Sequence, residues 1–220
     1  MTKTMIILLA LAAVGCGGGS EGDDDDAGSA GGDAAVDSGM TVLDAGAPDS
    51  ASAVDASMGV FSLTSPVLAE GMRFANEYTC VGGIDVSPEL AWTPGPAGTL
   101  SYAIVLTDVT FNNFVHWVIW DIPANTIPLS LPRAVPRSAN LSSPVGAKQC
   151  TSYTSPPTFG YRGPCTPVND GVHNYRFTVY ALDVATLPGV TTNTARTAVR
   201  TQVLAHDLAS ASLNGTFSQP

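Results

Sequence analysis

Positive charge is scarce in this chain, and long hydrophobic runs are absent. Lys and Arg make up only nine of the 220 residues, against nineteen Asp and Glu, and the formal net charge at pH 7 is −10. This composition argues against a nucleic-acid-binding protein, which needs a basic surface to neutralise phosphates. The longest apolar run, residues 5–14, is far shorter than the roughly 20 residues that a helix needs to cross a bilayer.

Charged residues are few overall, and this scarcity favours a folded chain. They form 13% of the sequence, whereas apolar residues form 45%, which is enough for a packed core and excludes wholesale disorder. The length suits one domain with tails. Glycine and proline together number 22 + 16 = 38, a content that favours turns and strands over long helices.

The acidic residues are concentrated in one segment. Residues 17–59 hold ten Asp and Glu with no Lys or Arg, whereas from Val60 onward nine acids face eight bases. The segment is rich in Gly, Ala, Ser and Asp and has no aromatic residue, so it cannot bury enough apolar area to fold. Its four consecutive Asp residues lack the spaced ligands of a calcium loop. We predict a disordered acidic linker over 17–59 and a folded domain over 60–220.

The first sixteen residues, MTKTMIILLALAAVGC, have the pattern of a secretory signal peptide. Lys3 precedes the apolar run, and the closing Ala-Val-Gly-Cys resembles the lipobox of bacterial lipoproteins. That resemblance implies cleavage before Cys16, acylation of Cys16 and attachment to a membrane of the bacterial cell envelope, facing the periplasm or the exterior. Each acyl methylene that enters the bilayer contributes about 0.8 kcal/mol. The alternative is an ordinary cleaved signal with an incidental cysteine.

Short strands dominate the predicted domain. Segments rich in β-branched and aromatic residues, bounded by Pro and Gly, lie at 60–63, 89–92, 100–108, 114–122 and 174–183. The 100–108 segment is almost continuously apolar, which indicates a central strand covered on both faces. The 174–183 segment alternates, with its odd-numbered apolar residues from Tyr175 to Ala181 on one face.

One helix is predicted, over residues 194–211. Val199, Val203, Leu204 and Leu208 follow helical spacing, with Ala211 extending the stripe. Together with the strands, this pattern predicts a mostly-β fold, a β-sandwich with a C-terminal helix.

Three polar residues lie within or beside these apolar strands. Asp108 ends one strand, His116 lies inside FVHWVIW, and His173 precedes NYRFTVY. Burying a carboxylate costs several kcal/mol unless it accepts hydrogen bonds or meets a cation, and histidine can supply both near neutral pH. Each residue taken alone is better explained as a satisfied polar group at a strand end. Their recurrence at strand edges predicts a shared site.

Several motifs of the domain occur in the order of one known family. They are FSLTSP (61–66), EYTCVGGIDVSPELAW (77–92), IVLTD (104–108), FVHWVIWDIP (114–123), YRGPC (161–165), DGVHNYRFTVYALD (170–183) and LAHDLASASLNGTF (204–217). In this order and spacing the chain resembles the phosphatidylethanolamine-binding protein family, in its bacterial YbhB/YbcL (Raf kinase inhibitor-like) branch. The resemblance implies a β-sandwich with a C-terminal helix.

The resemblance also implies a small pocket that binds a phosphate-type headgroup. The residues at the matching positions are Asp108, His116, Gly163, Pro164, His173 and Tyr175. The family's DPDAP loop reads Asp-Val-Thr-Phe over 108–111 here, and its His-Arg-Tyr reads His-Asn-Tyr over 173–175. We therefore expect an altered pocket rim.

Three cysteines remain besides Cys16, which in an oxidising compartment implies one disulfide and one free thiol. We expect Cys150–Cys165, which would clamp the Pro-rich loop between them. The alternative is Cys80–Cys165, because members of the family carry counterparts of these two cysteines without Cys150. Three cysteines without paired short spacings do not favour zinc.

The sequence thus predicts a lipid-anchored envelope protein that binds a small anionic or phosphorylated ligand, without catalysis, cofactor or metal. An alternative is inhibition of an extracytoplasmic protease or another protein partner through the loops at 109–115 and 128–167. A weaker alternative is a hydrolase, because two histidines and an aspartate resemble a metal-ligand set.

Overall fold

A computed structural model describes residues 59–219. The predicted signal peptide, Cys16 and all but the last residue of the predicted linker lie outside the described residues. The elements in chain order are β1 (Leu63–Thr64), β2 (Met72–Arg73), the 3-10 turn η1 (Asn76–Tyr78), β3 (Leu90–Trp92), β4 (Ser101–Asp108), β5 (Phe114–Pro123), β6 (Ser130–Leu131), β7 (Lys148–Gln149), β8 (His173–Leu182), α1 (Arg196–Ala205) and β9 (Asp207–Phe217). Within 59–219, no helix has the length and apolar character that crossing a membrane requires.

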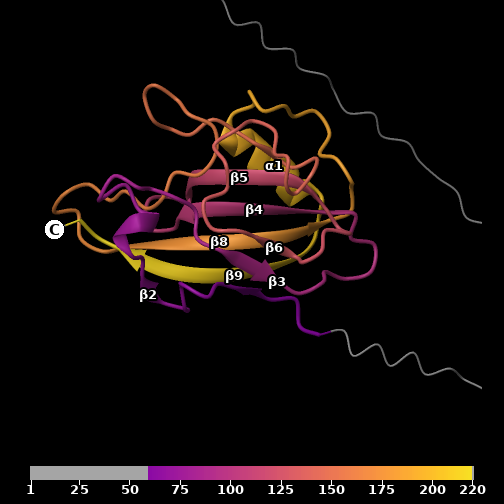
Figure 1. Cartoon of the computed structure of the whole chain (residues 1–220), viewed down its shortest axis with the longest axis horizontal. Coiled ribbons are helices and arrows are strands. Elements are labelled where there is room, and N and C mark those ends of the chain that lie inside the picture. The colour runs from indigo at the N-terminus through magenta and orange to yellow at the C-terminus, as the bar shows by residue number, and fades with distance from the viewer. Residues whose placement is uncertain (1–58, 220) are drawn as a thin grey trace, which may run out of the picture. The chain divides into compact units, whose positions relative to one another are not determined.

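The strands form two sheets, which confirms the predicted mostly-β sandwich (Figure 1). The larger sheet has the order β2-β9-β8-β4-β5-β7, and the smaller has the order β1-β3-β6. The long neighbours β8, β4 and β5 are all antiparallel, so the end of β4 lies beside the start of β8. This arrangement brings strand ends that are distant in the sequence to the same edge of the sheet.

The larger sheet is covered on both faces. All eight residues of β4 are buried, as expected for a central strand. Tyr175, Phe177, Val179 and Ala181 of β8 share one face, as predicted, and belong to the main core. Residues of the smaller sheet, including Leu90 and Trp92, complete that core.

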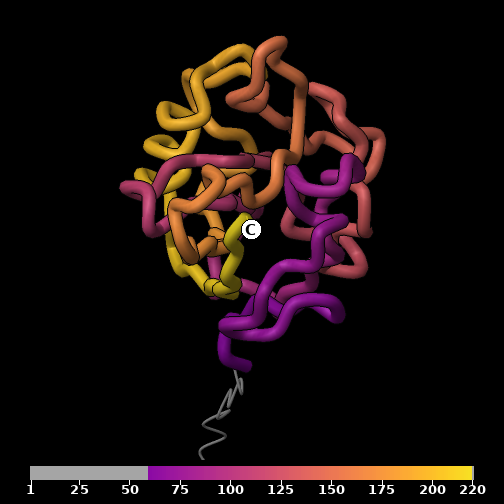
Figure 2. Tube along the Cα trace, turned by 90° about the vertical axis from the view of Figure 1, so that its left-hand side faces the viewer, coloured from indigo at the N-terminus to yellow at the C-terminus, as the bar shows by residue number. Residues whose placement is uncertain are grey.

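The second face packs against α1. Val199 and Val203 of the helix are fully buried against alternate residues of β4 and β5, such as Val105 and Trp120. In Figure 2 the coil of α1, near the yellow end of the colour bar, lies on the opposite side of the molecule from most of the indigo N-terminal segments.

The helix is shorter than predicted. It ends at Ala205, the chain turns at His206, and residues 207–211 belong to strand β9. Ala211 pairs with Val179 of β8, and Leu208 is 43% exposed. The prediction of helix over 206–211 is wrong because pairing along the whole of β8 outweighs the weak local preference of an Ala/Ser/Leu segment.

Candidate functional site

A β-bulge orients the first candidate residue, His116. Leu106 of β4 pairs with Trp117, but the next residue, Thr107, pairs with Val115. His116 is therefore the extra residue of the bulge, and bulges commonly redirect a side chain beside a functional site. The bulge places the imidazole against Tyr175 of β8, with ring centroids 5.3 Å apart.

The other two candidates, Asp108 and His173, form an ion pair where β4 ends and β8 begins. His173 Nδ1–H donates to Asp108 Oδ2 at 2.7 Å, and its Nε2–H donates to Asp170 Oδ2 at 3.2 Å. The remaining oxygen of Asp108 accepts the Phe111 backbone N–H at 2.9 Å. Asp108 and His173 are buried, whereas the Asp170 side chain is 56% exposed.

These contacts favour the charged form of His173. Burial lowers the pKa of this imidazole, but the hydrogen bonds and charges of Asp108 and Asp170 outweigh burial and leave the pKa raised. Hydrogen bonds to a carboxylate at each ring nitrogen favour the protonated ring over the neutral one.

His116 is in the opposite state. Desolvation lowers its pKa to about 4, and the attraction of Asp108 and the hydrogen bond to Gly163 offset only part of that effect. Its Nδ1 lies 3.0 Å from the carbonyl oxygen of Gly163. A carbonyl only accepts, so Nδ1 carries the hydrogen, and Nε2 of the neutral ring is an acceptor.

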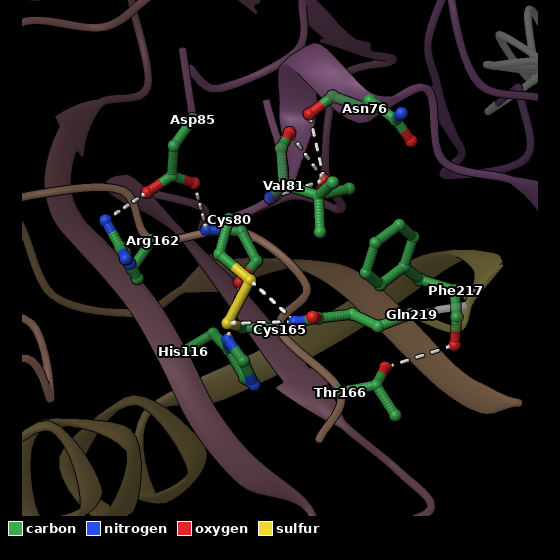
Figure 3. Close-up of a disulfide and its surroundings, with 12 residues drawn as sticks. Asn76, Cys80, Val81, Asp85, His116, Arg162, Cys165, Thr166, Phe217 and Gln219 are labelled. Carbon is green, nitrogen blue, oxygen red and sulfur yellow. Dashed lines mark hydrogen bonds and ion pairs between the residues drawn. A yellow bond between two sulfur atoms is a disulfide. The ribbon is translucent and has the colours of Figure 1, made fainter. Parts of the chain in front are cut away.

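Asp85 holds Gly163 from its other side, and Figure 3 shows Asp85 beside Arg162, the residue before Gly163. The Gly163 N–H donates to Asp85 Oδ1 at 2.9 Å. Asp85 is buried and pairs through Oδ2 with Arg162 at 2.7 Å and with Arg137 at 3.1 Å. A Cβ at Gly163 would lie 2.0 Å from the carbonyl oxygen of Tyr78, so only glycine fits.

The disulfide joins Cys80 to Cys165, with Cα atoms 5.3 Å apart (Figure 3). The expected pairing of Cys150 with Cys165 is wrong, and the alternative forms instead. Cys150 is a buried free thiol that packs in the core beneath α1, where burial raises its pKa to about 12. Cys165 lies elsewhere, at the border of the cavity described next. The two cysteines are therefore close in the sequence but are not bonded in the structure.

These residues surround an open cavity of about 150 Å³ at the edge of the larger sheet. Its lining residues are Asp108, Phe111, Phe114, His116, Tyr153, Cys165, Pro167, Asp170 and His173. The structure thus brings together Asp108, His116 and His173 from three different strands.

The other predicted site residues lie behind the cavity wall. Tyr175 is fully buried, and its hydroxyl lies 3.2 Å from Thr166 Oγ1. Burial raises the Tyr175 pKa, so it stays a neutral phenol. Gly163 and Pro164 do not line the cavity. Gly163 contacts the lining residue His116 through its carbonyl, and the carbonyl of Pro164 accepts the Cys80 backbone N–H at 3.1 Å.

Aromatic rings form the wall that sequence reasoning missed. The rings of Phe114 and His116 lie 5.2 Å and 5.0 Å from that of Tyr153. Behind the wall, the Arg196 guanidinium lies 5.9 Å from the Phe114 ring centre and 5.6 Å from that of Tyr153. Tyr153 lies in a Pro/Ser-rich loop with no distinguishing pattern, so the sequence did not indicate it. Asp170 lies only three residues before His173, and this short spacing could have identified it as a neighbour of the imidazole.

The lining is therefore a polar floor with an apolar wall, which suits a small polar group attached to a less polar body.

Within residues 59–219, no cluster of three or more His, Cys, Asp and Glu side chains has the arrangement of a metal site.

Comparison with known proteins agrees with this fold. The family model "Phosphatidylethanolamine-binding protein" matches residues 64–218. A UPF0098 protein of Aquifex aeolicus is 34% identical over 164 residues, which cover 74% of this chain and 89% of that protein. A Mycobacterium tuberculosis protein named "Putative lipoprotein LppC" is 32% identical over 126 residues, 56% of each chain.

A solved structure shows the same architecture. The crystal structure of E. coli YbcL, described as a new member of the mammalian PEBP family, aligns with a TM-score of 0.62 at 24% identity and covers 73% of this chain and 99% of YbcL. At that identity the likeness concerns the fold. With the family model matching most of the domain, the chain belongs to the phosphatidylethanolamine-binding protein family.

Proposed function

We propose that this protein is a non-catalytic binding protein that holds a small phosphate-type group in the cavity at the edge of its larger sheet. The observation that carries the proposal is the convergence of Asp108, His116 and His173, from three strands, on one open cavity. A lipid headgroup and a free phosphate compound share this chemistry, and either source is compatible with the cavity.

Two imidazoles and the shape of the cavity support this proposal. The His173 imidazole lies at the floor between Asp108 and Asp170, and His116 offers its second ring nitrogen beside it. Phe111 and Phe114 line the cavity with apolar surface, which suits the carbon chain attached to a phosphate. The volume of about 150 Å³ suits a headgroup rather than a whole lipid.

Binding without turnover fits the lining better than hydrolysis does. Among the lining residues there is no Ser, Thr or Lys, and the one cysteine, Cys165, is bonded to Cys80. The Tyr153 hydroxyl is buried, and desolvation raises its pKa. A mechanism with a hydroxyl or thiol nucleophile needs such a group, activated, beside a base, and the lining side chains provide neither a free thiol nor an exposed hydroxyl.

We also propose that acylation of Cys16 attaches the protein to a membrane of the cell envelope, with residues 17–59 as the tether. The lipobox-like residues before Cys16 and the relative named as a lipoprotein support this location. Mass spectrometry of the membrane fraction tests it: acyl chains on an N-terminal Cys16 are expected, and an unmodified mature N-terminus would contradict the anchor.

Calorimetric titration of the full chain in detergent with inorganic phosphate tests the binding function. We expect binding to be lost in a variant that combines His116→Ala with His173→Ala. The matched control is His206→Ala, because His206 contacts Asp183 and does not line the cavity. Phosphate binding that survives the double substitution would contradict the proposed function.

A further inference from the structure

The polar lining of the cavity carries little positive charge for an anionic ligand. Asp108 and Asp170 bring two carboxylates, and His173 between them brings one positive charge when its ring is protonated. His116 is neutral, because burial lowers its pKa to about 4. Two negative charges and one positive charge leave this lining with a net charge of −1, to which a bound phosphate group would add.

Arg196, the first residue of α1, places a positive charge behind the aromatic wall of this cavity. Its guanidinium lies 5.9 Å from the centre of the Phe114 ring and 5.6 Å from that of the Tyr153 ring, and both rings line the cavity. In the part of the chain that the structure describes, no Asp or Glu forms an ion pair with Arg196. Burial lowers its pKa, but an arginine stays charged in a protein.

Two hydrogen bonds hold this guanidinium in place. Its Nε–H donates to the carbonyl of Val115 and its Nη1–H donates to the carbonyl of Thr151, both at 2.9 Å. Val115 follows Phe114 in β5, and Thr151 lies two residues before Tyr153. Arg196 therefore ties together the two segments that carry the wall. Because both acceptors are neutral carbonyls, its charge is not cancelled by either contact.

A partly buried charge without an acidic partner is costly, because it has lost part of its hydration. A bound anion would offset this cost. Only one aromatic layer separates the guanidinium from the cavity, and the wall excludes water from the space between them. A unit charge at roughly 8–10 Å in a medium with an effective dielectric constant near 20 changes the affinity for an anion by at least about tenfold.

Building on the proposed function, we propose that Arg196 supplies, from behind Phe114 and Tyr153, the positive charge that balances the anion in the cavity. It is a positioning residue, because it acts through the two rings and does not line the cavity itself. Its charge attracts the phosphate of a lipid headgroup and free phosphate alike.

The alternative is a structural role, in which the two carbonyl hydrogen bonds serve only to hold the wall together. Removal of the guanidinium would then lower the stability of the domain without changing the electrostatics of the cavity. The imidazole of His116 distinguishes these roles without any ligand. Arg196 repels the protonated ring and so helps burial to lower the His116 pKa, against the attraction of Asp108. Loss of this charge should therefore raise the pKa of His116.

The test is calorimetric titration of the full chain in detergent at pH 7 with inorganic phosphate and with dimethyl phosphate, a diester like the phosphate of a lipid. We expect Arg196→Gln to bind both probes at least about tenfold more weakly than the wild-type chain. Arg196→Lys keeps the charge, so its affinity should lie closer to that of the wild-type chain. The matched control is Arg200→Gln, because Arg200 belongs to the next turn of α1 and stacks on neither ring.

The outcomes separate this inference from the proposed function. Phosphate binding that is unchanged in Arg196→Gln would overturn the inference and leave the proposed function intact. Equal losses in Arg196→Gln and Arg200→Gln, or an Arg196→Lys that binds no better than Arg196→Gln, would also overturn it. If the wild-type chain binds neither probe, both proposals are wrong.

A pH titration followed by NMR adds the readout that a structural role would not move. The His116 pKa should be higher in Arg196→Gln than in the wild-type chain, and an unchanged pKa would contradict a charge that acts across the wall. If Arg196→Gln does not fold, Arg200→Glu decides instead, because it places a carboxylate one helical turn from Arg196. Arg200→Glu should bind phosphate severalfold more weakly than Arg200→Gln, and equal affinities would overturn the inference.

Discussion

Removal of the Cys80–Cys165 disulfide should strongly destabilise the domain. The two cysteines are 85 residues apart in the sequence. In the chain-entropy treatment, closing a loop of that length lowers the entropy of the unfolded chain by an amount worth about 4.5 kcal/mol at 25 °C. The rejected pairing of Cys150 with Cys165 would close a much shorter loop, worth about 3 kcal/mol.

The perturbation is the double variant Cys80→Ser with Cys165→Ser, and the assay is urea unfolding followed by tryptophan fluorescence. Trp92, Trp117 and Trp120 are all buried, so their emission reports loss of the core. We expect the free energy of unfolding to fall by about 4.5 kcal/mol, within the 2–5 kcal/mol seen when native disulfides are removed. Reduced wild-type protein should match the double variant.

The control is Cys150→Ala, which removes the free thiol. This variant leaves the disulfide in place, so its loss should be only that of a small buried group. Alkylation should label Cys150 only after unfolding, because the thiol is buried with a pKa of about 12. A peptide map that links Cys150 to Cys165, or a loss below about 1.5 kcal/mol in the double variant, would refute the reasoning.

Three further perturbations test the support of the site. Gly163→Ala should lower the melting temperature by several degrees, because its Cβ would lie 2.0 Å from the Tyr78 carbonyl; thermal unfolding checks this. Asp85→Asn should cost about 1–3 kcal/mol in urea unfolding, because a neutral amide replaces the buried carboxylate that binds the Gly163 N–H and two arginines, and these arginines remain partly solvated. The pKa of His116 falls from 6.5 unfolded to about 4 folded, so its contribution, up to about 3 kcal/mol, is present above pH 6.5 and lost as pH falls toward 4. Urea unfolding from pH 4 to 7 should show that the free energy of unfolding falls as the pH is lowered. In His116→Gln this dependence on pH should be weaker.

Much of the fold could be predicted because it depends on local pattern. The apolar run ending at Asp108 indicated a strand buried on both faces, and the alternation that includes Tyr175 indicated which face meets the main core. The strand that starts at His173 was equally visible. Placing the two strand ends together needed only the knowledge that β4 and β8 are antiparallel neighbours.

The rest depends on pairing between distant segments. The bulge at His116 exists only relative to β4, so no pattern within FVHWVIW reveals it. The partner of Cys165 depends on how the segment that contains Cys80 packs. The helix ends where it does because residues 207–211 pair with β8 as a strand. Local sequence favoured a nearer cysteine and a longer helix because it contains no information on these contacts.

The charge state of the cavity is decided by residues that do not touch it. Asp85 fixes the Gly163 peptide through its N–H, and the carbonyl of Gly163 then fixes the hydrogen of His116 on Nδ1. Tyr175 closes the space behind the same ring and keeps water from it. A buried, neutral imidazole with its free nitrogen toward the cavity follows from these contacts together. Asp85 is therefore a positioning residue for the proposed site: its loss should weaken the proposed phosphate binding as well as the stability of the domain, whereas a merely structural residue would change only stability.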